Sequence, residues 1–199
     1  NELRQRERKD LIKSHKMSRD ISELLVYSND NNIKPVFAIL LVHLKSHLDK
    51  DKIDPHGNLR RQAEAKFLAK VYKRLEKQFP DIPIVISGDF NNCLYDETNW
   101  DLTPIRELAL KDVFDFINEP YELRTTHVHF DREGKPTDHQ LDYILFDPKY
   151  VEELDPEESG AYLYRDQYGN RLAIPREHYH RYALPSDHFP VVASVKLKI

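Results

Sequence analysis

Two short apolar segments near the start of the chain predict a β-hairpin. Residues 21–27 (ISELLVY) and 36–42 (VFAILLV) are rich in the branched and aromatic residues that favour strands. Residues 28–32 between them are Ser, Asn and Asp, which favour turns. The second segment is apolar at consecutive positions, as strands buried on both faces are, so we expect a covering layer on each side of it.

A long amphipathic helix is predicted to follow. Between Asn58 and Pro80, apolar residues recur at every fourth position, and the proline is expected to end the helix. The residues of this stripe are Leu59, Ala63, Phe67, Val71, Leu75 and Phe79. Basic residues occupy the other positions, so we expect Arg60 and Arg61 to lie at a solvent-exposed helix end.

Short strands dominate the rest of the chain. The further predicted strands are 82–87, 124–130, 140–146 and 191–197. Residues 131–136 contain Asp, Gly and Pro and are expected to join the second and third of these strands. The pair Thr103–Pro104 is typical of a helix start, with an N-cap followed by proline at the first helical position. The chain is therefore predicted to have a mixed α/β fold.

Composition restricts the class of protein. A length of 199 residues predicts a single domain over 1–199. The 30 basic and 34 acidic residues give a formal charge of -4, which excludes a uniformly basic nucleic-acid binder but permits local basic patches. The one cysteine, Cys93, can form neither an intrachain disulfide nor a thiolate metal cluster. No segment has the roughly 20 apolar residues of a membrane-spanning helix. We expect a soluble protein, cytoplasmic by preference, and the sequence identifies no protein partner.

Two regions are expected to lie outside the regular elements. Residues 1–18 form a charged lead-in, most simply a solvated surface helix, with a nucleic-acid-binding arm as the alternative. Residues 147–185 are a long variable loop region. Its first part, 147–158, carries six acidic residues and one lysine, which predicts an exposed acidic loop. Connections of this length without a clear pattern are more often functional than not.

Four short strings combine polar residues with predicted strand ends. They are HLKS at 43–46, GDFN at 88–91, LDYI at 141–144 and SDHFPV at 186–191. Each has an ordinary structural explanation by itself, since Asp89 is a typical turn former and His43 could be a structural histidine. The combination of all four is much more specific than any one of them.

In this order and spacing, the four strings resemble the endonuclease/exonuclease/phosphatase superfamily, the DNase I-like metal-dependent phosphohydrolases. The resemblance extends from about Arg19 to the C-terminus. It implies a DNase I-like four-layer α/β sandwich of two packed sheets. It also implies that the N-terminal part of the fold is missing from this chain, because the family's first half, with the glutamate that is its principal metal ligand, would lie upstream of Asn1.

The resemblance assigns roles to individual residues. It implies that Asp89 acts on the attacking water and that Asn91 donates its amide to a phosphoryl oxygen. His188 and Asp142 match the family's His–Asp pair, and His43 matches a residue that contacts the phosphate. The implied catalytic residues are therefore His43, Asp89, Asn91, Asp142 and His188.

Metal and substrate contacts are implied as well. Asp187 matches a metal-binding carboxylate, and Asp89 is the second candidate ligand. Carboxylates suit Mg²⁺ or Mn²⁺, which prefer hard oxygen ligands. Candidate substrate-binding residues are Arg19, near the rim of the site, and Lys45, Tyr179 and Arg181. The tyrosine-, arginine- and histidine-rich segment that holds the last two could stack bases and grip phosphates, or form a lid over a small phosphate ester.

The residue types fit phosphate-ester hydrolysis. The reaction needs an activated water and neutralisation of charge on the phosphoryl oxygens. A carboxylate such as Asp142 would fix the tautomer of His188 and raise its pKa, whereas the residue types leave open whether Asp89 or His188 is the base. A zinc site of histidines, such as His127 and His129, is a weaker alternative because their spacing matches no established pattern.

The leading hypothesis is a Mg²⁺-dependent phosphohydrolase, most simply a phosphodiesterase or nuclease. Its partner would be a phosphate-ester substrate, with nucleic acid as one option. Two alternatives stay open: a phosphomonoesterase acting on a small phosphate ester, and a catalytically silent binding or scaffold module of the same fold. The natural substrate cannot be identified from the sequence.

Overall fold

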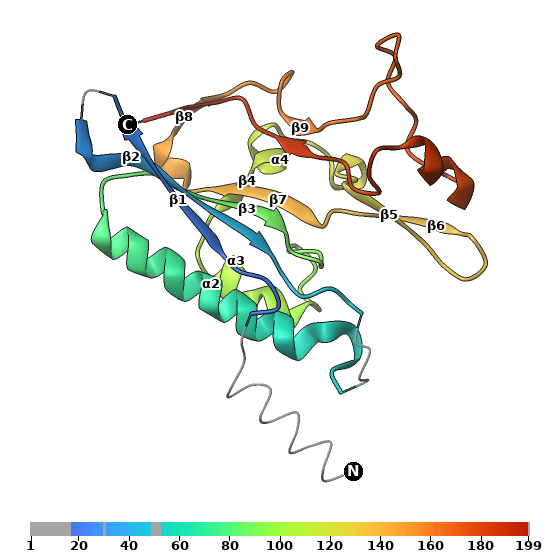
Figure 1. The fold of residues 1–199 in the computed structure, drawn as a ribbon, viewed down its shortest axis with the longest axis horizontal. Helices are drawn as coiled ribbons and strands as arrows, with labels where there is room; N and C mark the ends of the chain where they lie inside the picture. The colour runs from blue at the N-terminus through green and yellow to red at the C-terminus, as the bar shows by residue number, and fades with distance from the viewer. Residues whose placement is uncertain (1–16, 30, 49–52, 199) are drawn as a thin grey trace.

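A five-stranded sheet with helices on one face forms the centre of the protein (Figure 1). The structure is a computed structural model that describes residues 17–29, 31–48 and 53–198. Most of the predicted charged lead-in, residues 1–16, lies outside these described residues. Within them, no helix is long and apolar enough to cross a bilayer.

The central sheet has the strand order β1-β2-β3-β7-β4. Its strands are β1 (Ser22–Ser28), β2 (Asn31–His43), β3 (Ile84–Asp89), β7 (Asp142–Phe146) and β4 (Lys111–Asp112). β2 and β3 run parallel, and the other neighbouring pairs run antiparallel. The predicted hairpin and the second buried strand are thus confirmed. The parallel pair requires a crossover, which the long helix provides.

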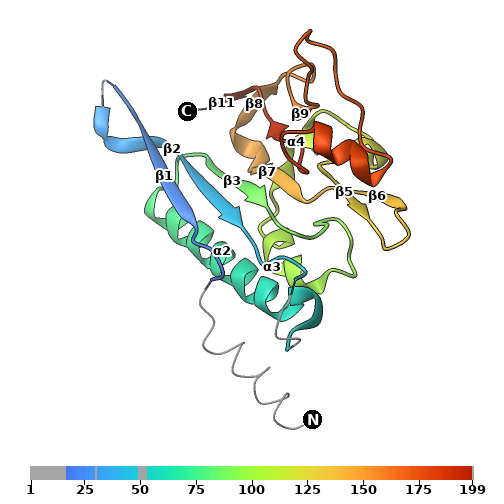
Figure 2. The same cartoon turned by 45° about the vertical axis from the view of Figure 1, so that its right-hand side comes forward.

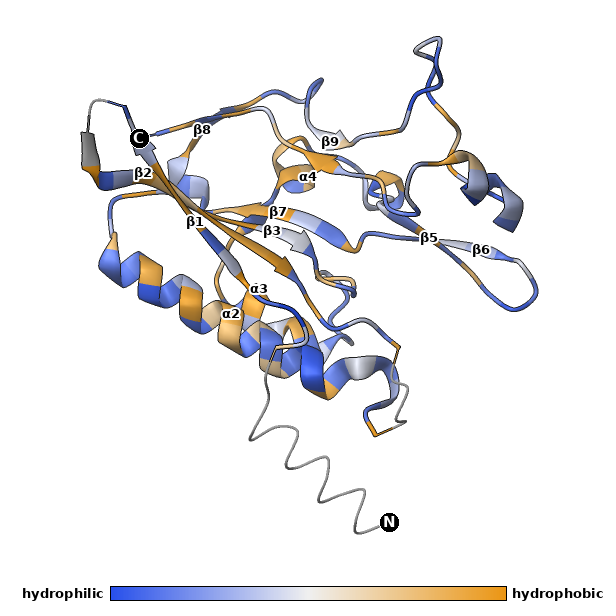
Figure 3. Ribbon diagram, in the orientation of Figure 1, coloured by the Kyte–Doolittle hydropathy of each residue, from blue (hydrophilic) through white to orange (hydrophobic). Residues whose placement is uncertain are grey.

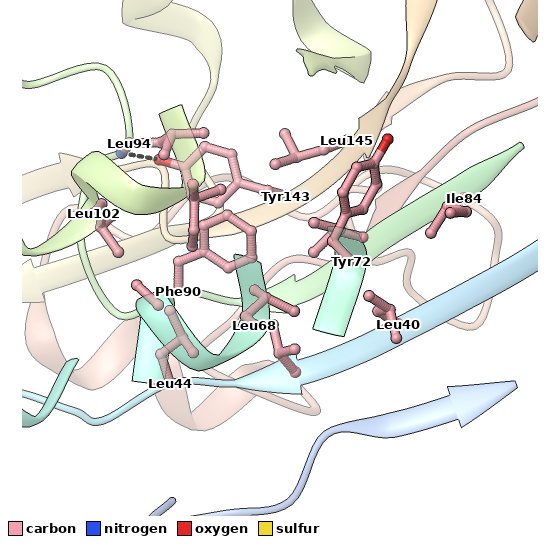
Figure 4. Packing of buried hydrophobic residues seen from close by; sticks show 14 of the residues in the cluster. Leu40, Leu44, Leu68, Tyr72, Ile84, Phe90, Leu94, Leu102, Tyr143 and Leu145 are labelled. Atoms are coloured by element: carbon pink, nitrogen blue, oxygen red, sulfur yellow. Dashed lines mark hydrogen bonds between the residues drawn. The ribbon is translucent and has the colours of Figure 1, made fainter. Parts of the chain in front are cut away.

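Two helices cover one face of this sheet, and Figure 3 shows apolar residues gathered between the layers. They are α2 (Asn58–Gln78) and the short α3 (Thr103–Arg106), which confirm the predicted helices, although the N-cap of α3 is Leu102 and not the predicted Thr103. In the core, Phe90 stacks on Tyr143 with ring centroids 4.8 Å apart (Figure 4). The hydroxyl of Tyr143 accepts a hydrogen bond from the Leu94 N–H at 2.9 Å. The chain after β3 is therefore fastened to β7.

The buried face of α2 differs from the predicted apolar stripe. Phe67 belongs to that stripe but is 49% exposed. The residues that are buried are Arg61, Glu64, Ala65, Leu68, Ala69, Tyr72 and Leu75. A helix has 3.6 residues per turn, so a row of every fourth residue turns by about 40° at each step and leaves the buried face. The prediction of a solvent-exposed Arg61 was wrong, since its side chain is fully buried.

The other face of the sheet is covered over β3, β7 and β4. The segments on this face are α4 (Val113–Phe116), β8 (Val151–Leu154), β9 (Gly160–Ala161), β10 (Val191–Val192) and β11 (Val195–Leu197). β9 pairs with β10 and β8 with β11, so the single last strand predicted at 191–197 is in fact two short strands. Over β1 and β2, Leu24 and Leu41 are each 41% exposed. Only one face of β2 is therefore fully covered by the described residues.

A separate hairpin extends from the end of the sheet (Figures 1 and 2). It pairs β5 (His127–Phe130) with β6 (Pro136–His139), a strand that the sequence did not predict. β7 begins only after this hairpin and joins the central sheet, so the segment between the two predicted strands is not a simple connection but contains β6. The physical reason is that residues 131–134 form a tight turn closed by Asp131, which lets the chain return at once.

Short 3-10 helices complete the described chain. They are η1 (Pro55–Gly57), η2 (Trp100–Leu102), η3 (Tyr121–Leu123), η4 (Pro148–Tyr150) and η5 (His178–Ala183). The predicted acidic loop 147–158 holds η4 and β8, so it is partly regular. Both views show η5 beside the β5–β6 hairpin, where Phe130 contacts His178 with ring centroids 5.7 Å apart (Figure 2).

Candidate functional site

Three polar residues form one row across the central sheet. His43 is the last residue of β2, Asp89 the last of β3, and Asp142 the first of β7. The Cα of His43 pairs with that of Asp89, and the Cα of Asp89 pairs with that of Asp142. Two strands run parallel and the third antiparallel, so two strand ends and one strand start meet at the same edge of the sheet. The topology thus brings together residues from three of the four sequence strings.

Glycine is required just before Asp89. Gly88 has a φ of +143°, and a Cβ added there would lie 1.9 Å from the carbonyl oxygen of Val42. Any other residue would collide with the main chain of β2. Gly88 therefore allows Asp89 to lie close to the end of the neighbouring strand.

The turn after Asp89 is built around its carboxylate. The Asn91 N–H donates to Asp89 Oδ1 at 2.7 Å, and the Asn91 side-chain amide donates to Asp89 Oδ2 at 2.9 Å. The same amide also donates to the Leu44 carbonyl oxygen at 3.0 Å. Asn91 has a φ of +53°, a conformation that asparagine tolerates better than most residues. These bonds hold the amide of Asn91 between two strand ends.

His188 reaches this row from the loop before β10. Its Nδ1 lies 2.8 Å from Asp142 Oδ2. Thr126 ties both partners down, because its Oγ1 accepts from the Asp142 N–H at 3.1 Å and its carbonyl accepts from the Phe189 N–H at 2.7 Å. An isolated antiparallel β-bridge between the main chains of His127 and His188 also attaches the His188 loop to β5. The structure thus brings the predicted His–Asp pair together.

The surroundings of this pair favour the charged imidazole. The hydrogen bond to Asp142 is the largest influence and raises the pKa of His188 above its ordinary value. A carboxylate that accepts from Nδ1–H fixes the tautomer and leaves Nε2 for another partner. His188 can therefore present a proton at Nε2 towards the site.

Burial acts on the other two members of the row. It raises the pKa of Asp89 from 3.8 to about 6, and the negative charge of Asp142 adds to the effect. Burial also lowers the pKa of His43, helped by the positive charges of Arg19 and His188. His43 Nε2 lies 3.3 Å from Asp89 Oδ2. At neutral pH the site therefore places a neutral imidazole beside a largely ionised carboxylate.

Asp89, Asp142 and His188 form a possible metal-binding group. Each offers one ligand atom, and these atoms all lie within 4.8 Å of one another. In the stretches 17–29, 31–48 and 53–198, no other set of three His, Cys, Asp or Glu side chains comes so close. The histidines considered for zinc, His127 and His129, are outside this group. Two neighbouring carboxylates, one of which has a raised pKa, are a natural place for a divalent cation.

Asp187 is not a member of that group. Its carboxylate pairs with the guanidinium of Arg181, and its Oδ2 lies 3.9 Å from His127 Nε2. The side chain is 48% exposed. Arg181 therefore engages this predicted ligand, although the charge of Asp187 still acts on the neighbouring His188.

The four predicted substrate-binding residues lie in different surroundings. Arg19 is exposed, and its charge acts on both His43 and Asp89. The Lys45 ammonium donates to the carbonyl oxygens of Ser46, at 3.0 Å, and Leu48. Tyr179 is 60% exposed on η5, and Arg181 is engaged by Asp187. Among these four, Arg19 thus has a charge that acts on two members of the row.

His127 is a site neighbour that sequence reasoning did not select. Its ring centroid lies 4.8 Å from that of His188, and its side chain is 15% exposed. Burial lowers the pKa of His127 to about 4, and the nearby His188 acts in the same direction. The only sequence signal was the His-Val-His pattern of β5, which places two histidines on one face of a strand without identifying which one is buried.

The described structure is similar to solved structures of other proteins. Truncated TDP2 from Caenorhabditis elegans matches with a TM-score of 0.54 and 13% identity, over 88% of this chain and 66% of that chain. Beta toxin from Staphylococcus aureus matches with a TM-score of 0.50 and 19% identity, over 89% of this chain and 57% of that chain. This chain thus spans less than two thirds of either structure's length. No family model and no curated protein matches the sequence. At these identities the similarity shows a shared fold.

Proposed function

Because the chain has the DNase I-like fold of the endonuclease/exonuclease/phosphatase proteins, we propose that it is a divalent-metal-dependent phosphohydrolase. We further propose that its substrates are phosphodiesters, as in a phosphodiesterase or nuclease. The observation that carries the proposal is the contact of 2.8 Å between His188 Nδ1 and Asp142, beside the carboxylate of Asp89. These half-buried side chains supply both a proton donor and a proton acceptor in one site.

The proton-transfer roles follow from the hydrogen bonds. His188 uses Nδ1 for Asp142, so its Nε2 is the atom that can donate a proton to a phosphoryl or leaving oxygen. Asp89 is oriented by Asn91 and is the carboxylate best placed to accept a proton from an attacking water. Positioned acid–base groups of this type contribute about 10²- to 10⁴-fold in rate.

Phosphate binding would use groups around the same row. Arg19 carries a positive charge that acts at His43 and Asp89, and the amide of Asn91 is neutral and does not repel an anion. His43 is neutral at pH 7, so it would contact the phosphate through a hydrogen bond. Tyr179 and Arg181 lie further out on η5, where they could contact the remainder of a larger substrate.

A Mg²⁺ or Mn²⁺ ion fits the donor set. Asp89 and Asp142 would hold it through their oxygens, which such ions prefer, with the nitrogen of His188 close by. Asp187 could join only by leaving its pair with Arg181. When bound, the ion would supply charge neutralisation at the phosphoryl oxygens and lower the pKa of a coordinated water.

The test is hydrolysis of bis-p-nitrophenyl phosphate by the full-length protein, with Mg²⁺, with Mn²⁺ and with EDTA. The His188→Ala variant is expected to lose at least about 100-fold in rate. His129→Ala is the matched control, because His129 lies exposed on the nearby hairpin. Its rate should stay near that of the wild type.

Three results would change the proposal. Turnover of p-nitrophenyl phosphate without turnover of the diester would indicate a phosphomonoesterase. Activity that survives both EDTA and His188→Ala would exclude the proposed site. A folded protein that hydrolyses neither ester would leave the binding-module alternative in its place.

A further inference from the structure

The long helix α2 buries two charged side chains against the end of the sheet that carries the candidate site. Arg61 and Glu64 are both fully buried, and they lie three positions apart on one helix face. Burying a charge is costly unless it is paired and hydrogen-bonded. The partners of these two side chains therefore indicate what the fold uses them for.

Both side chains hold the main chain of one residue, Lys45. Arg61 Nη1 donates to the Lys45 carbonyl oxygen at 2.6 Å. Glu64 Oε2 accepts from the Lys45 N–H, also at 2.6 Å. Lys45 lies two residues after His43, the last residue of β2. These bonds therefore fix the chain just after the strand end that positions His43. The preceding residue, Leu44, bonds to the other strand end through the Asp89 carbonyl oxygen.

Glu64 also holds a second segment of the site. Its Oε1 accepts from the Ser18 N–H at 2.8 Å and from the Ser18 hydroxyl at 2.5 Å. The next residue is Arg19, whose charge acts on His43 and Asp89. One buried carboxylate thus anchors the segments that carry Arg19 and His43.

Arg61 also holds the turn after β3, through the buried side chains of Asp101 and Asn92. Its Nε pairs with Asp101, and Asp101 accepts from the Asn92 side-chain amide at 3.2 Å. Asp101 is fully buried, as Arg61 is, so their charges are compensated away from water. Asn92 follows Asn91 directly. Arg61 therefore connects the end of β2 with the turn that orients Asp89.

We propose that Arg61 and Glu64, here called the helix clamp, are positioning residues for the site. They touch neither substrate nor reacting atoms, and they set the relative positions of Arg19, His43 and Asn91. The proposal rests on the proposed phosphohydrolase function. It goes beyond that function because it assigns to the helix a share of the catalytic geometry.

The main test compares three variants in kcat/KM for the diester. Glu64→Gln replaces one of the two accepting carboxylate oxygens by an amide nitrogen that can only donate. We expect kcat/KM to fall about 10- to 100-fold, because a displacement of about 1 Å at a site can reduce the rate about 10²-fold. Ser18→Ala, a milder change at an exposed residue, should lose about two- to fivefold. Leu68→Ala is the control: Leu68 is buried on the same helix, one turn from Glu64, and packs in the apolar core, so its loss should stay within about threefold.

The double variant Arg19→Ala/Glu64→Gln distinguishes a positioning role of Glu64 from a general loss of structure. If Glu64 acts partly through Arg19, Glu64→Gln should cost at least about threefold less in an Arg19→Ala protein than in the wild type. Equal losses of kcat/KM in the wild type and in Arg19→Ala would overturn the proposal that Glu64 acts through Arg19. Arg61→Lys, which keeps the charge but loses the fork of donors, should reduce kcat more than it raises KM.

Amide hydrogen exchange gives a readout that needs no turnover. Exchange at either the Ser18 or the Lys45 amide should be at least about tenfold faster in Glu64→Gln than in Leu68→Ala, because glutamine keeps one carbonyl oxygen and can accept from only one of the two N–H groups. This result in a protein that hydrolyses no ester would refute the proposed function and support the clamp's structural role. Unchanged exchange at both amides in Glu64→Gln would refute the clamp.

Discussion

A buried carboxyl on strand β4, beside β7, should make the stability of this protein depend on pH. Asp112 ends β4 and is fully buried. Its Oδ2 accepts from the Gln140 amide at 2.6 Å, while Asp112 Oδ1 and Gln140 Oε1 have no hydrogen-bond partner among the described residues. Burial is the main cause that raises the pKa of Asp112 from 3.8 to about 7. A proton on this group removes a buried charge and turns an acceptor into a donor.

The sign and size of the effect follow from linkage. Between pH 4 and pH 7 the folded protein holds a proton on Asp112 that the unfolded chain releases, so the free energy of unfolding falls as pH rises through this range. A change in pKa from 3.8 to about 7 corresponds to a loss of about 4 kcal/mol, at about 1.4 kcal/mol per pKa unit. Asp89, whose pKa is raised to about 6, adds to the loss in the same direction.

The Asp112→Asn variant isolates the contribution of Asp112. The amide cannot ionise, so the variant should keep only the part of the pH dependence that other groups such as Asp89 cause. We expect it to be more stable than the wild type at pH 7.5 and to differ less from it at pH 4.5. Urea unfolding at both pH values measures this, with the exposed Glu122→Gln as a matched control. An Asp112→Asn protein with the full pH dependence of the wild type would refute the reasoning.

Three further substitutions and one control test the site and the core. Gly88→Ala places a Cβ 1.9 Å from a β2 carbonyl oxygen, so little folded protein is expected by circular dichroism, and a native spectrum with normal stability would contradict this. Asp142→Asn removes the main cause of the raised pKa of His188, so an NMR titration should show that pKa falling and turnover should drop about 100-fold; an unchanged titration would argue against the pair. Leu40→Ala, at a fully buried position, should cost roughly 2–5 kcal/mol in urea unfolding. Leu48→Ala, at a position that is 77% exposed, should cost less than about 0.5 kcal/mol, and equal costs would contradict the assigned core.

The elements with strong local signals were predictable. The hairpin of β1 and β2, the strand β3 and the extent of α2 follow from runs of apolar residues, turn residues and a terminating proline. The β5–β6 hairpin was missed because residues 136–139 (PTDH) have no apolar pattern, so only pairing with β5 makes them a strand.

Helix α2 shows most clearly what the sequence pattern could not predict, which is the burial of charged side chains. Spacing placed Arg61 among solvent-exposed basic residues, whereas the structure buries it with Glu64. Whether a charged residue is buried depends on partners such as Asp101, which lies forty positions further along the chain. Periodicity describes one helix and contains no information about such a partner.

The sequence by itself determined which residues stand at the strand ends, because short motifs and strand propensity depend on neighbouring residues. His43 and Asp89 were identified in this way, and the strings LDYI and SDHFPV identified Asp142 and His188. Only the tertiary structure decided that β2, β3 and β7 are neighbours in one register, which brings these residues into contact. It also decided that Asp187 pairs with Arg181, since that depends on the path of η5. Pairing and burial arise where distant surfaces meet, and that information is spread over the whole chain.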